Sequence, residues 1–113
     1  MKAAKRLKKN EDFRKVYNNK DSIANRLLIL YIKKNDLGYN RAGFTVSKKL
    51  GKSVVRNKIK RRMKESYRLN DEKIKQGYDL VFIAREKCVD ANYWEIESAL
   101  MHLVKKKNLL LKE

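Results

Sequence analysis

Residues 53–69 read "SVVRNKIKRRMKESYRL", and this stretch decides how the rest of the chain is interpreted. At helical spacing Val55, Ile59, Met63 and Ser66 share one side, which is the side expected to pack. Six of its first twelve residues are nevertheless Lys or Arg. We therefore predict an amphipathic helix that packs against the core on one side and carries dense positive charge on the other.

The basic residues of this helix belong to a longer block that excludes acidic residues. From residue 37 to residue 64 the chain has ten Lys or Arg and no Asp or Glu. The whole chain has 30 Lys plus Arg against 13 Asp plus Glu, a formal net charge of +17. Such a charge favours a polyanionic partner, and the acid-free block favours a phosphate-facing surface over a generally solvated basic face.

The polar side of the predicted helix holds the candidate phosphate contacts. Ser53 is suited to cap the helix, but Arg56 and Lys58 lie close to the positive end of the helix dipole, where each costs about 0.3 to 1 kcal/mol. Phosphates of a partner would relieve this conflict. The candidates on the helix and the preceding loop are Lys48, Lys49, Lys52, Arg56, Asn57, Lys58, Lys60, Arg61, Lys64 and Arg68.

Patterns on either side of this helix predict one small domain over residues 1–113, with residues 1–8 as a loose basic arm. We expect a helix at 10–19 capped by Asn10, strands at 27–33, 41–49 and 77–85, and a last helix opened by an Asn92–Glu95 capping box. The first two strands should form an antiparallel hairpin. The third is apolar on both faces, so it should lie centrally. The order α-β-β-α-β-α predicts an α+β sandwich.

Three other residue types have less specific interpretations. Phe13 and Tyr17 share one face of the first helix, which suits a core role as well as an aromatic binding site. Cys88 is the single cysteine, so we interpret it as a buried inert thiol in a reducing compartment. His102, the only histidine, falls outside the apolar face of the last helix and is interpreted as a surface residue.

Several classes of function are disfavoured. The longest apolar run, "LLILYI" at 27–32, is too short to span a bilayer, so we expect a cytoplasmic protein with no membrane partner. "GKS" at 51–53 is not a nucleotide-binding loop, because that motif needs glycine where Val46 stands. The chain also shows no pair of titrating groups suited to acid–base catalysis, so no catalytic residue and no protein-bound metal are expected.

The stretch "GFTVSKKLGKSVVRNKIKRRMKESYR" resembles the signature of the bacterial ribonuclease P protein family, whose hallmark is an Arg-Asn-Arg core in a basic helix. The resemblance extends from "LKKNEDFRKVY" near the start to the final helix. Lys58 stands where the hallmark has its second Arg. A lysine keeps the charge but cannot form a bidentate fork to phosphate, so contact there should be less directional.

This resemblance implies a role as the protein subunit of ribonuclease P, in which an RNA catalyst that uses Mg²⁺ removes the 5′ leader of precursor tRNA. It implies that the candidate residues of the central helix and loop bind ribonuclease P RNA. It also implies a leader-binding cleft between the first helix and the sheet, formed by Phe13, Tyr17, Tyr31 and Arg56. A left-handed β-α-β crossover is expected from the resemblance alone, because general rules favour the right hand.

Three alternatives follow from the composition. A basic ribosomal or other structural RNA-binding protein would share the charge and could share the fold. A DNA-binding protein is disfavoured, because no partner helix precedes the central helix at the spacing of a helix-turn-helix. A membrane-surface helix is weaker still, since the narrow apolar stripe is required for the core.

Overall fold

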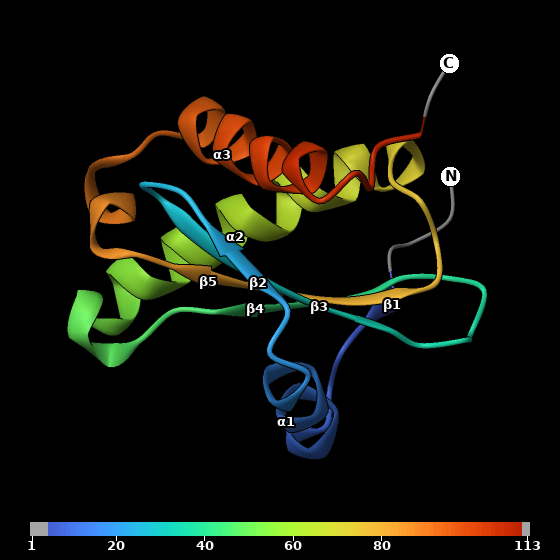
Figure 1. Cartoon of the computed structure of the whole chain (residues 1–113). Helices are drawn as coiled ribbons and strands as arrows, with labels where there is room; N and C mark the ends of the chain where they lie inside the picture. The colour runs from blue at the N-terminus through green and yellow to red at the C-terminus, as the bar shows by residue number, and fades with distance from the viewer. Residues whose placement is uncertain (1–4, 112–113) are drawn as a thin grey trace.

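The structure is a computed structural model that describes residues 5–111. Three helices and a five-stranded mixed sheet make up an α+β domain, as predicted (Figure 1). The elements are β1 (Lys5–Arg6), α1 (Asn10–Asn18), β2 (Ser22–Ala24), β3 (Leu28–Lys34), β4 (Arg41–Thr45), η1 (Lys48–Leu50), α2 (Ser53–Asn70), η2 (Asp71–Lys73), β5 (Tyr78–Ala84), η3 (Glu86–Asp90) and α3 (Tyr93–Lys106).

The sheet separates two layers of helix. Its strand order is β1-β4-β5-β3-β2, with α2 and α3 on one face and α1 alone on the other (Figure 1). The main core lies under α2 and α3, where Phe44, Tyr67 and Phe82 pack with ring centroids 5.9 to 6.0 Å apart. A smaller core of Leu7, Val16 and Val81 lies under α1.

The predicted hairpin of the first two long strands is wrong. β5 lies between them and pairs antiparallel with β3 and parallel with β4. Because β5 is buried along most of its length, the central position removes more apolar surface from water than a hairpin would. The connection from β3 to β4 crosses the start of β5, where Asn40 donates to Lys75 O and accepts from Tyr78 N. The parallel pairing of β4 and β5 confirms the crossover through α2, and its left hand stays a prediction.

The predicted ends of several elements also need correction. Lys5 and Arg6 pair with β4 and Leu7 is buried, so the loose arm is wrong for these residues, whereas residues 1–4 lie outside the described part. β4 ends at Thr45 because Lys48–Leu50 turn into a 3-10 helix. Asn10 and Ser53 are first helical residues rather than caps. The Asn92–Glu95 capping box of α3 is confirmed.

The remaining core predictions agree with the structure. Leu28, Leu30 and Ile32 share the buried face of β3, and Ile96, Leu100 and Leu103 bury the inner face of α3. Cys88 is fully buried, and burial raises the pKa of its thiol, in keeping with an inert role. None of the helices within residues 5–111 has the length and apolar character needed to cross a membrane.

A buried ion pair connects α1 to the sheet. Asp79 is almost fully buried, and its carboxylate accepts from Arg41 Nη2 at 2.7 Å and Nε at 2.9 Å. Asn35 Nδ2 donates to the same carboxylate at 2.9 Å. Arg41 Nη1 also reaches Asp12 of α1 at 3.5 Å. Arg41 therefore holds two strands and one helix at a single point.

Replacing Arg41 by Ala should lower the free energy of unfolding by about 3 kcal/mol, because it leaves the buried Asp79 charge without its cation. Asp12→Asn should cost less than about 1 kcal/mol, since that contact is longer and more exposed. Urea unfolding of both variants measures the difference. Equal costs for the two would contradict the assignment of Asp79 as the main partner.

Candidate nucleic-acid interface

Helix α2 is divided between core and solvent as the sequence predicts. Ile59, Met63 and Ser66 are buried, and Val55 is half-buried. Tyr67, next to Ser66, is buried as well and widens this stripe. Asn57, Lys58 and Arg61 are exposed on the opposite side, which we call the outer face of α2. No other described element covers these three side chains, so they are accessible to a polyanion.

Within residues 5–111, neither an acidic residue in the first turn nor an N-cap side chain balances the positive end of α2. Its first turn contains no acidic residue, and Lys52 at the N-cap position provides no side-chain cap. Lys48, Lys49 and Lys52 are exposed beside it, and Ser47 Oγ accepts from Lys49 N at 3.2 Å to shape the one-turn helix η1. The exposed amides and the lysine charges together favour an anion at this end of the helix.

Two of the predicted contact residues are held by other parts of the protein. The Arg56 guanidinium donates to Gly51 O at 3.1 Å and to Ser53 Oγ at 3.2 Å, so it braces the loop before α2. Arg68 donates to Glu65 at 2.5 Å, and this pairing lowers the pKa of Glu65. Their charges remain near the outer face, but their donors are partly used within the chain.

Lys60 and Lys64 lie on the flank of α2 that faces α1 and β4, next to its outer face. Both line a hollow between α1, β4 and α2, and Lys60 with Phe13 and Phe44 also lines a second, adjoining hollow. The two hollows have volumes of about 520 and 610 Å³ and together form what we call the α1–α2 groove. Its lining residues are Arg6, Leu7, Lys8, Asn10, Phe13, Arg14, Tyr17, Ala42, Gly43, Phe44, Thr45, Val46, Lys60 and Lys64.

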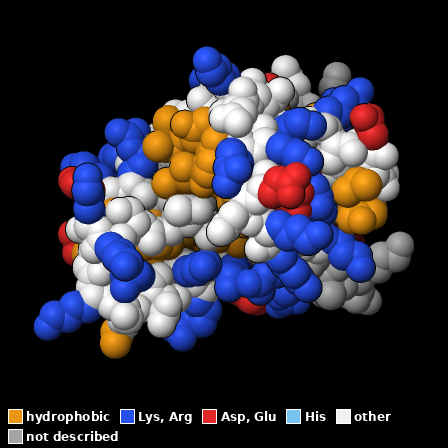
Figure 2. All heavy atoms as spheres, turned by 90° about the horizontal axis from the view of Figure 1, so that it is seen from below, with side chains coloured by type: hydrophobic (Ala, Val, Ile, Leu, Met, Phe, Trp, Pro, Cys, Tyr) orange, Lys and Arg blue, Asp and Glu red, His pale blue; other side chains and the backbone are white. Residues whose placement is uncertain are grey.

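The predicted aromatic residues come together beside this groove. Tyr17 and Tyr31 meet edge to face with ring centroids 5.1 Å apart, and Tyr17 Oη lies 3.4 Å from Thr45 Oγ1. Phe13, Tyr17 and Tyr31 all pack on the smaller core but remain partly exposed. On this face of the molecule, hydrophobic side chains gather into a patch bordered by Lys and Arg (Figure 2). The core and binding interpretations of these rings are thus compatible.

The structure changes the membership of the predicted cleft. Among the described residues, those that line the α1–α2 groove include neither Tyr31 nor Arg56. Tyr31 contacts Tyr17 from beside the groove, and the Arg56 guanidinium is held on the loop at 51–53. The groove instead contains Arg6, Lys8 and Arg14, which sequence reasoning missed. The position of Arg14 next to Phe13 on an amphipathic helix could have indicated that it lies beside the groove. No local sequence pattern indicated Arg6 and Lys8, because they reach the groove only through the pairing of β1 with β4.

The positive charges of Arg6, Lys60 and Lys64 lie close together in the groove. Burial, followed by the nearby charges of Arg6 and Lys60, lowers the pKa of Lys64. Within residues 5–111, no group of three or more His, Cys, Asp or Glu side chains lies close enough to hold a metal ion. The groove therefore presents cations and partly exposed aromatic rings, a combination that suits single-stranded nucleic acid.

The fold and these surfaces define a small basic RNA-binding protein. The profile of the family described as Ribonuclease P matches residues 1–108. The "Ribonuclease P protein component" of Alkaliphilus oremlandii is 64% identical over 110 residues, which cover 97% of this chain and 96% of that relative. The chain belongs to the ribonuclease P protein family, and it is a subunit of the ribonucleoprotein that acts in tRNA 5′ processing.

Solved structures agree with this assignment. The ribonuclease P protein of Staphylococcus aureus superposes with a TM-score of 0.87 at 37% identity, covering 96% of this chain and 99% of that one. The protein from Thermotoga maritima gives a TM-score of 0.83 at 32% identity over 90% of this chain and 96% of that one. The resemblance inferred from the central helix is therefore confirmed, as is the fold class.

Gly43 sets the position of Phe13. A Cβ atom added to Gly43 would lie 2.5 and 2.6 Å from two carbons of the Phe13 ring. Gly43→Ala should therefore destabilise the fold by about 1 to 3 kcal/mol through overpacking. In a Phe13→Ala background the same change should cost little, because the clashing ring is gone. Urea unfolding of the four proteins measures this coupling, and additive costs would contradict it.

The lowered pKa of Lys64 provides a test of the charge cluster. Arg6→Gln removes one repelling charge, so the pKa of Lys64 should rise toward its ordinary value of 10.5. NMR titration of the lysine side chains measures this shift, with Lys105→Gln on α3 as the control that leaves it unchanged. In the unmodified protein, the charged form of Lys64 is disfavoured in the folded state. Its contribution to stability therefore increases as pH rises from the lowered value toward 10.5.

Proposed function

We propose that this chain binds two RNA segments at once, on two adjacent faces of α2. The outer face of α2 and the lysines of the preceding loop bind the RNA subunit of ribonuclease P. The α1–α2 groove, together with Tyr31, binds the single-stranded 5′ leader of precursor tRNA. The proposed contacts to the RNA subunit are Lys48, Lys49, Lys52, Arg56, Asn57, Lys58, Arg61 and Arg68.

The observation that carries this proposal is the turn of Lys60 and Lys64 into the groove, while Asn57, Lys58 and Arg61 remain on the outer face. One helix thereby presents cations to two adjacent surfaces. Because Ile59, Met63 and Tyr67 are buried in the main core, both surfaces belong to a rigid, well-packed element. A rigid helix with two binding faces can fix the distance between an RNA subunit and its substrate.

The groove suits a leader of variable sequence. Bases stack on aromatic side chains with about 1 to 3 kcal/mol per base and little sequence preference. The partly exposed rings of Phe13, Tyr17 and Tyr31 supply such surfaces, and Lys60, Lys64 and Arg14 supply cations for the phosphates. Lys60 and Lys64 therefore belong with the leader contacts rather than with the RNA-subunit contacts to which the sequence assigned them.

The chemistry resides in the RNA subunit, and the protein acts by position and charge. Mg²⁺ bound by RNA oxygens would activate the attacking water, a task that suits a cation with oxygen ligands. The protein reduces phosphate repulsion between the two RNAs and restricts the leader to one path. We place this activity in the cytoplasm, in keeping with the single reduced cysteine.

The decisive experiment adds the protein to a bacterial ribonuclease P RNA at a magnesium concentration too low for efficient cleavage by the RNA alone. The protein should restore 5′ cleavage of precursor tRNA, because its cations replace part of the missing counterion charge. A ribosomal RNA-binding protein would give no stimulation. Absence of stimulation across a range of protein concentrations would overturn the proposal.

Two variants separate the two surfaces. Tyr31→Ala should weaken binding of leader-bearing tRNA by about 5- to 100-fold and leave mature tRNA unaffected. Arg61→Ala should weaken assembly with the RNA subunit and should not distinguish leader-bearing tRNA from mature tRNA. Lys106→Ala on α3 removes the same charge as Arg61→Ala and serves as its control. Equal losses for both tRNA forms in Tyr31→Ala would return Tyr31 to a purely structural role.

A further inference from the structure

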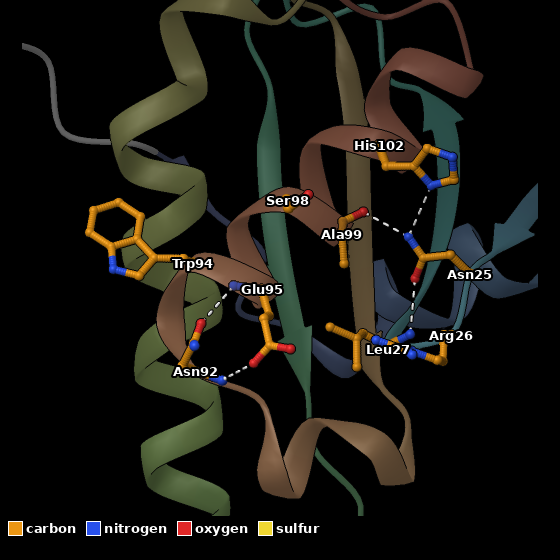
Figure 3. A pocket seen from close by; sticks show the side chains of 9 residues that line it. All are labelled: Asn25, Arg26, Leu27, Asn92, Trp94, Glu95, Ser98, Ala99 and His102. Atoms are coloured by element: carbon orange, nitrogen blue, oxygen red, sulfur yellow. Dashed lines mark hydrogen bonds between the residues drawn. The ribbon is translucent and has the colours of Figure 1, made fainter.

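A third hollow lies on the other side of the sheet from α1. It separates the connection between β2 and β3 from the outer surface of α3 and has a volume of about 460 Å³ (Figure 3). We call it the α3 hollow. Its lining residues are Asn25, Arg26, Leu27, Asn92, Trp94, Glu95, Ser98, Ala99 and His102. None of them lines the α1–α2 groove or belongs to the outer face of α2, so the proposed function does not use this site.

Trp94 is the unusual residue of this hollow. It is the only tryptophan of the chain and is 72% exposed, although large aromatic side chains are normally covered. Tyr93 contacts its indole edge to face with ring centroids 5.1 Å apart, which supports the ring from one side. Ser98 and His102 follow at intervals of four residues, so all three share one face of α3. The helix thus carries an exposed aromatic platform at one end of a polar track.

Asn25, on the β2–β3 connection, determines which nitrogen of His102 carries the ring proton. Its Oδ1 accepts from the backbone amides of Leu27 and Leu28 at 3.1 and 2.9 Å, so its amide orientation is determined. Its Nδ2 then donates to Ala99 O at 2.9 Å and faces His102 Nδ1 at 3.2 Å (Figure 3). His102 Nδ1 must accept in this arrangement, which assigns the ring proton to Nε2. His102 therefore offers a donor to an acceptor on a ligand.

The charge around the hollow is predominantly positive. Arg26 also lines an adjoining hollow with Arg85, Glu86 and Lys87, so the two hollows form a continuous surface. Arg85 donates to Asn25 O at 2.7 Å, which places its cation beside the same connection. The carboxylate of Glu95 is engaged with the Asn92 amide in the capping box. An aromatic platform, an imidazole donor and several cations together match a nucleotide rather than an apolar peptide.

We infer that the α3 hollow is a second binding site for single-stranded RNA. A base stacks on Trp94, whose indole extends away from the other lining residues (Figure 3), a phosphate further along the strand pairs with Arg26, and His102 Nε2 donates to an oxygen of the sugar–phosphate chain. A protein partner is a poorer match, because specific interfaces bury about 800 Å² per partner around an apolar centre, and here the indole is the one large apolar side chain of the lining that is exposed. The site goes beyond the proposed function and does not depend on which RNA the groove binds.

The single tryptophan makes the test site-specific. A short oligoadenylate of about ten nucleotides is titrated into the Tyr31→Ala variant, in which the groove is weakened, while Trp94 fluorescence is recorded. We expect saturable quenching that is weakened by about tenfold in Arg26→Ala, because phosphate pairing is lost. Lys73→Ala, which removes an exposed charge elsewhere, should leave the titration unchanged. Absence of quenching at RNA concentrations that saturate the groove of the unmodified protein would overturn the inference.

A second measurement follows the RNA instead of the protein. In the Tyr31→Ala background, Trp94→Ala should weaken binding of fluorescently labelled oligoadenylate by about 5- to 100-fold in anisotropy. An unchanged affinity would mean that the indole does not stack on a base. Quenching that depends on protein concentration without RNA would identify a second copy of the chain as the occupant and would also overturn the inference. Neither outcome bears on cleavage stimulated through the groove.

Discussion

The packing of α2 on the sheet is the constraint on which the rest of the molecule depends. Ile59, Met63 and Tyr67 bury one stripe of this helix against Phe44 and Phe82. Once that stripe is fixed, the direction of every other side chain on α2 follows from the helical repeat. The repeat directs Lys60 and Lys64 toward α1, and it leaves Asn57 and Arg61 in solvent. A rotation of the helix would merge the two surfaces or bury their charges.

The second requirement is a fixed position for α1, since this helix forms the far wall of the groove. Gly43 provides space for the Phe13 ring, and Arg41 joins Asp12 to the buried Asp79. Neither contact buries a large apolar area. The position of α1 therefore depends on its small core, on the close approach of Phe13 to the Gly43 backbone and on the Arg41–Asp12 ion pair. This arrangement keeps Phe13 and Tyr17 only partly buried, which is what a stacking surface needs.

The charge distribution shows a local conflict between stability and binding. Lys64 is partly desolvated and lies near Arg6 and Lys60, and the start of α2 has no acidic residue to offset its dipole. A sequence selected for stability alone would place carboxylates at these positions. An anionic partner would compensate the positive charge that these missing carboxylates leave unbalanced. This is consistent with a subunit that binds RNA.

The sequence by itself determined the elements with strong local patterns. The periodicity of α2 and α3, the capping box and the doubly apolar β5 were predictable because they depend on residues a few positions apart. The family signature also lies in one continuous stretch. Only the tertiary structure decided that β5 separates β3 from β4 and that Arg6 and Lys8 reach the groove. It also decided that Trp94 and Arg26 line one hollow. Strand order and side-chain convergence depend on contacts between distant segments, and these are settled by which arrangement buries the most apolar surface.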